Sequence, residues 1–208
     1  MTKGLENQTP PKDRILKSCD LDLVPFRLED VDETYQGGVT DEEVTRYLEV
    51  GFADRFISAL RDYVQSVLDD PKRNFYRLIH RASNRPTGTA SLAINVSHAT
   101  AAWGYLVGER DFWYPGISYQ AQVPLFDLAF DELGVRRFFG GPYGDNVRSQ
   151  FNLRRLGFKK KGVFRAHYRK APDSDEFVDV VYYGLMAEEW QAIRDRFEPL
   201  RYHGDEIG

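Results

Sequence analysis

The sequence predicts a single-domain α+β protein, in which helices flank a central mixed, mostly antiparallel sheet of about seven strands. Three observations favour this class. The chain has 208 residues, which suits one ordinary domain. Hydrophobic residues make up 42% of it and charged residues 29%, as in a globular protein with a core. Short strand-like segments follow one another in the first half, whereas helices and strands alternate in the second half.

The N-terminal segments are the first elements in order. Residues 1–18 are polar and are expected to form a flexible arm. The segment LDLVPFR, residues 21–27, alternates apolar and polar side chains, which is typical of a half-buried strand. Residues 28–48 indicate short helices that break at Gly37 and Gly38.

An amphipathic helix and a three-strand meander are predicted next. Apolar residues recur at helical spacing from residue 56 to residue 68, Asp54 is a candidate N-cap, and Pro71 ends the pattern. Short connections then separate three strand candidates, so these strands are expected to pair antiparallel. They are residues 74–81, 88–96 and 100–107.

The second half alternates helices with strands. In order, the patterns predict a helix at 117–133, a strand at 136–140, a helix at 146–156, strands at 158–168 and 177–185, and a helix at 187–197. Pro124 lies inside the first of these helices and is expected to kink it. The predicted organisation is therefore an arm at 1–18, one folded domain at 19–197 and a polar tail at 198–208.

Charge and cysteine content narrow the functional classes. Acidic residues outnumber basic ones by 32 to 28, giving a net charge of −4, which argues against a nucleic-acid partner. The single cysteine, Cys19, excludes an internal disulfide and a cysteine-based zinc cluster, so no metal is expected. No apolar run is long enough to cross a membrane, and the first residues do not resemble a signal peptide. We expect a cytoplasmic monomer or homodimer without a membrane partner.

A turn between a strand and a helix is the first candidate binding feature. The strand that ends at Val107 is followed by a loop, and Trp113 to Ser118 open a helix. Unpaired backbone N–H groups and the helix dipole make such a turn an anion site, and Gly116 gives the backbone freedom there. An ordinary strand-to-helix turn would have the same pattern.

The segment NVRSQFNLRRLGF is the second feature. Asn146 is a candidate N-cap, Leu153 and Leu156 form an apolar stripe, and Gly157 ends the helix. Structural roles alone account for most of these residues. The order of the two features along the chain carries more information than either one.

In this order, the sequence resembles the GNAT superfamily of acyl-CoA-dependent N-acetyltransferases, especially the branch of the ribosomal-protein N-terminal acetyltransferases (RimJ/RimL type). The resemblance extends over residues 22–190. It is carried by the segments LVPFRLEDVDE, GTASLAI, WGYLVGERDFWYPGISYQA, FDLAFDELGVRRFFGGPYGDNVRSQFNLRRLGF, RAHYRK and DVVYYGLMAEEW. It implies a GNAT-like sheet that splays near Tyr105 to admit acetyl-CoA, with transfer of the acetyl group to a primary amine.

The resemblance also implies a set of acetyl-CoA contacts. The family's pyrophosphate loop, Gln/Arg-x-x-Gly-x-Gly/Ala, corresponds to Trp113, Gly116 and Ser118, of which only the central glycine is an identical match. The strand segment from Tyr105 to Val107 would pair with the pantetheine arm of acetyl-CoA. Arg148, Arg154 and Arg155 would meet the nucleotide phosphates or would be solvated helix charges. The implied cofactor-binding residues are Tyr105, Leu106, Val107, Trp113, Tyr114, Pro115, Gly116, Ile117, Ser118, Asn146, Arg148 and Ser149.

The catalytic residues follow the family pattern less closely. Leu153 stands where many members have a tyrosine acid, so Ser149 is the candidate proton donor to the sulfur, although it could equally bond the backbone. Ala102 replaces a frequent glutamate. His167, with Tyr168 beside it, is the preferred candidate base, ahead of His80 and a chain of water molecules.

The acceptor amine stays open at this point. A protein N-terminus is one possibility, and a nucleotide-linked amino sugar is another, because residues 44–50 resemble GNAT-like proteins of polysaccharide synthesis. A polyamine or antibiotic amine is the third. The acceptor pocket is expected to be built from residues 28–56, the second and fourth strands and the loop 171–176. Aromatic side chains there and nearby would suit a compact acceptor: Tyr47, Phe52, Trp103, Trp113 and Tyr168. Since two usual catalytic positions differ, a non-catalytic acetyl-CoA sensor or scaffold is the alternative function.

Overall fold

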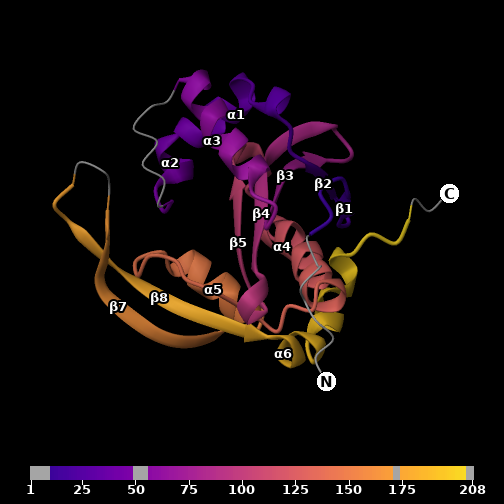
Figure 1. The fold of residues 1–208 in the computed structure, drawn as a ribbon, viewed down its shortest axis with the longest axis vertical. Helices are drawn as coiled ribbons and strands as arrows, with labels where there is room; N and C mark the ends of the chain where they lie inside the picture. Colours follow the sequence, from indigo (N-terminus) through magenta and orange to yellow (C-terminus); the bar gives the residue numbers. More distant parts are fainter. Residues whose placement is uncertain (1–9, 49–55, 171–173, 205–208) are drawn as a thin grey trace.

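The protein is described by a computed structural model, which covers residues 10–48, 56–170 and 174–204. Its centre is an eight-stranded sheet with the strand order β1-β2-β3-β4-β5-β6-β8-β7. The β5–β6 pair is parallel and all other neighbours are antiparallel. The α+β class and the mixed, mostly antiparallel sheet are confirmed, with one strand more than the predicted number (Figure 1).

The additional strand is β1 (Leu16–Lys17), which lies in the range that was predicted to be a flexible arm. It pairs with β2 (Leu21–Pro25), and both Leu16 and Ser18 are buried. The Ser18 hydroxyl lies 3.1 Å from the side-chain oxygen of Gln120, which also accepts the Asp20 N–H. A two-residue strand has no periodicity to reveal it in the sequence.

The C-terminal end is also fixed beyond the predicted domain boundary. A 3₁₀ segment, Arg194–Leu200, follows α6 (Ala187–Gln191), so the helix predicted for 187–197 is split. Arg201 then bridges to Ser18 and forms an ion pair of 3.0 Å with Asp127. The structure therefore anchors part of the predicted tail.

Three helices cover one end of the sheet: α1 (Glu33–Thr40), α2 (Glu42–Thr45) and α3 (Ile57–Asp69). The predicted break at Gly37 and Gly38 is wrong, because α1 runs through both residues and ends at Thr40. A Cβ atom on Gly38 would lie 3.2 Å from the Cα of Gly108, so this glycine permits a close contact between helix and loop. The candidate cap Asp54 lies outside the described residues.

The meander follows the prediction closely. It consists of β3 (Arg73–His80), β4 (Arg85–Asn95) and β5 (Thr100–Val107), and the last of these has the predicted bounds. β4 begins three residues earlier than predicted and includes Pro86, next to a register shift in its pairing with β3. Proline has no N–H to donate to a neighbouring strand, and it is tolerated there because the regular pairing is interrupted at this point.

The second half contains α4 (Ile117–Asp127), a π-helical turn (Leu128–Glu132), β6 (Arg137–Gly140) and α5 (Val147–Arg155), followed by the hairpin of β7 (Lys159–Arg169) and β8 (Phe177–Met186). Helix α4 extends through Pro124, which itself has no N–H to donate. None of the described helices combines the length and the apolar character that crossing a membrane requires.

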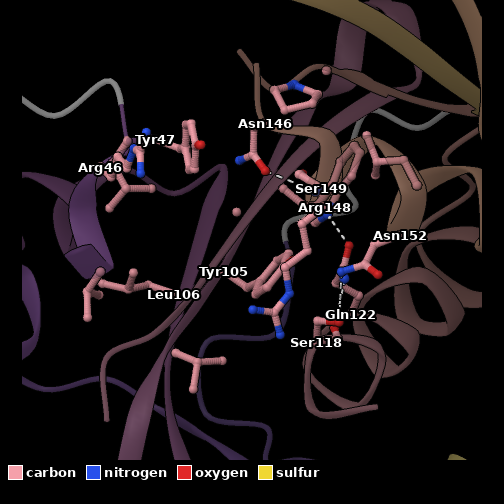
Figure 2. Close-up of a pocket in the computed structure, with 18 of the residues that line it drawn as sticks. Arg46, Tyr47, Tyr105, Leu106, Ser118, Gln122, Asn146, Arg148, Ser149 and Asn152 are labelled. Carbon is pink, nitrogen blue, oxygen red and sulfur yellow. Dashed lines mark hydrogen bonds between the residues drawn. The ribbon is translucent and has the colours of Figure 1, made fainter. Parts of the chain in front are cut away.

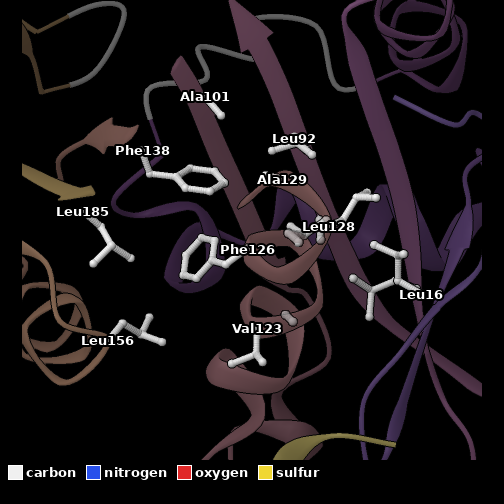
Figure 3. Packing of buried hydrophobic residues seen from close by; sticks show 14 of the residues in the cluster. Leu16, Leu92, Ala101, Val123, Phe126, Leu128, Ala129, Phe138, Leu156 and Leu185 are labelled. Atoms are coloured by element: carbon white, nitrogen blue, oxygen red, sulfur yellow. The ribbon is translucent and has the colours of Figure 1, made fainter. Parts of the chain in front are cut away.

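The larger buried cluster packs α4 and α6 against the sheet. Phe126 lies at its centre: its ring centroid is 4.7 Å from that of Phe138 and 5.5 Å from those of Trp103 and Trp190. Figure 3 shows Phe126 and Phe138 facing each other, with Leu156 and Leu185 beside them. A second cluster holds α1 and α3 on the sheet and consists of Phe26, Val31, Tyr35, Val39, Leu60 and Val64.

The sheet opens between β5 and β6. Only two residue pairs join these strands, Thr100 with Arg137 and Ala101 with Phe138. Figure 1 shows β8 and β7 turning away from β5, with α5 between them. Beyond Ala101, the edge of β5 that faces β6 has no partner strand among the described residues, which agrees with the predicted splay near Tyr105.

Candidate active site

A cavity of about 480 Å³ lies where the sheet splays (Figure 2). One wall is β5, from Trp103 to Val107, and the opposite wall is the first part of α5. The start of α4 closes one end and α2 lies over the other side. The lining residues are Glu43, Val44, Arg46, Tyr47, Leu48, Trp103, Gly104, Tyr105, Leu106, Val107, Trp113, Ile117, Ser118, Gln122, Gly140, Gly141, Pro142, Asn146, Arg148, Ser149, Asn152 and Leu153.

The turn before α4 has the conformation of an anion-binding loop. Gly116 adopts φ 99° and ψ −22°, in the left-handed region where a side chain is strained. Its carbonyl accepts the N–H groups of Tyr119 and Gln120, and the Ile117 N–H donates to the Tyr114 carbonyl at 3.5 Å. The N–H groups of Gly116 and Ser118 have no backbone acceptor among the described residues, so they are available to a ligand. The helix dipole adds a partial positive charge there.

The loop is fastened to the end of β5 by Trp113, whose indole N–H donates to the carbonyl of Val107 at 2.9 Å. Trp113, Ile117 and Ser118 line the cavity, whereas Tyr114, Pro115 and Gly116 are not among the lining residues. Tyr114 faces away, and its hydroxyl lies 3.5 Å from a carboxylate oxygen of Asp20. Tyr114 could thus meet an anion only through its backbone N–H, and Pro115 has no N–H to donate.

Polar side chains from three elements meet beside this loop. The Tyr105 hydroxyl is within hydrogen-bonding reach of Ser118 and Asn152, and the Arg148 guanidinium lies close enough to affect its pKa. Burial is the largest influence and raises the pKa of Tyr105, so its phenol stays protonated and can donate a hydrogen bond. Asn152 in turn donates to the Ser118 hydroxyl at 3.3 Å and accepts from Tyr119.

Gln122 connects the base of the cavity to its loop. Its side-chain oxygen accepts the indole N–H of Trp103 at 2.8 Å, and its amide nitrogen donates to the carbonyl of Ser118 at 2.7 Å. Gln122 is fully buried, so both bonds are well shielded from water. This amide holds the first turn of α4 in a fixed position relative to β5.

The N-terminus of α5 brings Asn146 and Ser149 to the cavity. The Asn146 side-chain oxygen accepts the backbone N–H of Ser149 at 3.0 Å, which confirms the N-cap expected from the sequence. The cap uses the oxygen of the amide, so its NH₂ group is available to a ligand. Figure 2 shows Asn146, Ser149 and Arg148 on the same side of the cavity.

The remaining wall is α2, whose position depends on Arg110. This guanidinium makes contacts of 2.6 and 2.7 Å with the two carboxylate oxygens of Asp41 and one of 2.5 Å with Glu43. Asp41 also caps α2 by accepting the N–H groups of Glu43 and Val44. Because Arg110 lies between β5 and the loop at Gly116, it links the α2 wall to the loop.

We expect Arg110→Met to raise the pKa of the Asp41 carboxyl toward its ordinary value of 3.8. The hydrogen bond from Arg110 is the largest influence that lowers this pKa, ahead of the bond from Val44 N–H. A lowered pKa stabilises the folded state above the unfolded-state pKa, and that stabilisation disappears as the pH falls through the folded-state pKa. An NMR titration of the carboxyl carbon measures the change. Arg85→Met is the matched control, because Arg85 pairs with Glu109 and Asp111; an unchanged Asp41 pKa in Arg110→Met would contradict the assignment.

The structure does not bring His167 and Tyr168 to the cavity. Neither residue lines it, and the His167 ring packs against Phe164, Tyr168 and Tyr182 on the β7–β8 hairpin. Strand β7 is irregular there, with Ala166 at φ 47°. The catalytic role of His167 and Tyr168 thus stays a prediction without geometric support. His80 is also outside the cavity lining and contacts Ser83 at 2.8 Å.

Several lining residues were not identified from the sequence. The sequence patterns did not indicate Gln122 or Asn152, and they indicated Arg46 only as part of the segment 44–50. Asn152 is three residues after Ser149, on the same face of a helix, and this spacing could have revealed it. Tyr47, Trp103 and Trp113 line the cavity as expected, whereas Phe52 lies outside the described residues. No group of three or more metal-ligating side chains was found among the residues that the structure describes.

Comparison with known proteins identifies the family. A sequence profile of the Acetyltransferase (GNAT) domain matches residues 20–159. The uncharacterized N-acetyltransferase YnaD of Bacillus subtilis (strain 168) is 24% identical over 75 residues, which is 36% of this chain and 42% of that protein. The aligned part is therefore less than half of that relative.

Two solved structures show the same fold. A GCN5-related N-acetyltransferase from Brucella melitensis is 21% identical, with a TM-score of 0.74 over 93% of this chain and 89% of that chain. RimL, the ribosomal L7/L12 α-N-protein acetyltransferase solved in complex with coenzyme A, is 21% identical, with a TM-score of 0.73 over 83% of this chain and 98% of that chain. Together with the profile match over most of the chain, the splayed sheet and its cavity, this similarity assigns the protein to the GNAT acetyltransferase family, whose members are acetyl-CoA-dependent N-acyltransferases.

Proposed function

We propose that the protein moves an acetyl group from acetyl-CoA to a primary amine by direct attack of the amine on the thioester. The observation that supports this proposal best is that one cavity joins the loop at Gly116, the open edge of β5 and the N-terminus of α5. The α2 wall completes the cavity and leaves room for an acceptor. A protein N-terminus, an amino sugar and a small amine are the candidate acceptors.

The lining groups suit the chemistry of the donor. Backbone N–H groups between Tyr114 and Ser118 would hold its diphosphate, and Arg148 would add a positive charge nearby. The unpaired edge of β5 offers main-chain groups to the amides of the pantetheine arm. Asn146 would donate its free NH₂ group to a carbonyl of the same arm. Acetyl-CoA itself supplies the activated acetyl thioester.

The residues at the N-terminus of α5 would act on the leaving group. As the amine nitrogen bonds to the acetyl carbon, the carbon–sulfur bond breaks and the sulfur needs a proton. Ser149 would donate it from its hydroxyl, which lines the cavity next to the Asn146 cap. Glu43 is the only carboxylate among the described lining residues, and Arg110 holds it in an ion pair. Water would thus take the proton that the amine loses and return it to the Ser149 oxygen, while the cavity holds the two reactants together.

We also propose that the protein belongs to the RimJ/RimL-like branch of the family. The order of the sequence motifs supports this assignment, since the fold similarity to RimL is no greater than that to the Brucella melitensis protein. The Trp113 indole, bonded to Val107, gives the first position of the loop a structural role that a flexible glutamine or arginine would not have.

We expect Ser149→Ala to lower kcat about a hundredfold because the sulfur loses its proton donor. The dissociation constant of acetyl-CoA should not change, since backbone groups elsewhere in the cavity bind the donor. Thiol release in the presence of an amine panel measures the first quantity, and titration calorimetry measures the second.

Ser66→Ala is the matched control, because Ser66 is an exposed helical serine of α3 whose hydroxyl donates to the Tyr63 carbonyl. Unchanged kcat in Ser149→Ala would remove Ser149 from the mechanism. Saturable acetyl-CoA binding without thiol release for any amine would instead support the non-catalytic sensor. Absence of binding by both acetyl-CoA and CoA would refute the proposed function altogether.

A further inference from the structure

The charged groups of the cavity are unevenly balanced. Among the described lining residues, three carry a charge at neutral pH: Glu43, Arg46 and Arg148. The carboxylate of Glu43 is neutralised by Arg110, which reaches it from outside the cavity lining at 2.5 Å. The two arginines therefore dominate the electrostatic potential that a bound molecule meets.

Arg46 has no acidic partner in the described part of the chain. It forms no ion pair or hydrogen bond there, and its guanidinium lies 5.3 Å from the centre of the Tyr47 ring. Stacking on an aromatic ring orients a guanidinium while its N–H groups stay free to donate. Figure 2 shows Arg46 and Tyr47 on the α2 wall, across the cavity from Asn146.

The two arginines serve different ends of the cavity. Arg148 is close enough to Tyr105 to influence its hydroxyl, and that hydroxyl reaches Ser118 in the loop that is proposed to hold the diphosphate. Arg46 directly follows α2 as its C-cap residue, and this segment contributes to neither the loop nor the open edge of β5. If Arg148 serves the donor, Arg46 is left for the acceptor.

We propose that the acceptor is a primary amine that also carries an oxyanion, a carboxylate or a phosphate, and that Arg46 binds this group. The inference rests on the proposed acetyl transfer and selects among its acceptors. A planar guanidinium binds such oxyanions through two parallel hydrogen bonds. A polyamine would instead bring further positive charge to a wall whose only described carboxylate is already paired. Both an acidic peptide N-terminus and a phosphorylated amino sugar have the required chemistry.

The test compares acceptors in pairs that differ only in the oxyanion. One pair is a peptide that begins Ser-Asp and its Ser-Asn counterpart, and the other is glucosamine 6-phosphate and glucosamine; spermidine serves as the cationic amine. We expect at least one anionic member to exceed its neutral partner about tenfold or more in kcat/KM. The pair that shows the preference distinguishes a peptide from a sugar acceptor.

Arg46→Gln should reduce this preference to less than about twofold without changing the dissociation constant of acetyl-CoA, and Arg46→Lys should retain part of it. Arg61→Gln, at an exposed position of α3 outside the cavity lining, is the matched control. The inference is overturned if neutral amines or spermidine are preferred, or if the preference survives in Arg46→Gln. If no amine releases CoA, the proposed acetyl transfer fails first, and the inference about its acceptor fails with it.

Discussion

Gly88→Ala is expected to destabilise the fold by about 3 kcal/mol. A Cβ atom on Gly88 would lie 1.8 Å from the carbonyl oxygen of Leu106 and 2.9 Å from its carbonyl carbon. Both are backbone atoms of β5, so no side-chain rotation relieves the clash, and the paired strands must separate. Because Leu106 also lines the cavity, the displacement should weaken acetyl-CoA binding as well.

Urea denaturation followed by circular dichroism measures the loss of stability. Gly37→Ala is the matched control, since a Cβ atom there meets no atom within 4 Å and Gly37 lies inside helix α1. That variant should be as stable as the parent or more stable by up to about 1 kcal/mol, because alanine favours the helix. Equal denaturation midpoints for the two variants would contradict the contact between Gly88 and β5.

Gly116→Val is expected to raise the dissociation constant of acetyl-CoA about ten- to a hundredfold. At φ 99° a β-branched residue is strained by about 1–3 kcal/mol, although the space around it is open. The loop relieves this strain by leaving the conformation that presents its N–H groups to the diphosphate. Binding must then restore that conformation, which lowers the affinity by the corresponding factor.

Gly134→Val separates the loss of binding from the loss of stability. Gly134 also has a positive φ, 62°, but it lies in the exposed turn before β6, whereas Gly116 stands between the lining residues Trp113 and Ile117. Both variants should lose a similar amount of stability, whereas calorimetry with acetyl-CoA should detect the loss of affinity only in Gly116→Val. Parent-like affinity in Gly116→Val would exclude the loop as the site of the diphosphate.

Elements with a strong local pattern were predictable from the sequence. The bounds of β5 and the N-cap of α5 at Asn146 agree with the structure because alternation and capping chemistry act within a few residues. The predicted break in α1 failed because Gly38 serves a contact with Gly108, seventy residues away along the chain. Local sequence cannot distinguish a glycine that ends a helix from one that admits a neighbouring backbone.

The candidate site was predictable where the backbone dominates. The turn at Gly116 and the start of α5 were both located, because glycine and cap residues leave a clear signal. The role proposed for Arg46 depends on Arg110 neutralising Glu43, a contact that connects residues far apart in the sequence. The position of His167 depends on an irregular stretch of β7 around Ala166, which no sequence pattern indicates.

The two residue pairs between β5 and β6 also have a mechanical consequence. Since the ladder stops at Ala101, the β1–β5 part of the sheet and the β6–β8–β7 part are joined only by a short seam of paired residues. Pivoting about this seam would change the aperture of the cavity without breaking any main-chain bond on either side. A bound coenzyme that bridges the halves would brace them, so the amides of β5 from Ala102 onward should exchange with deuterium more slowly when it is present.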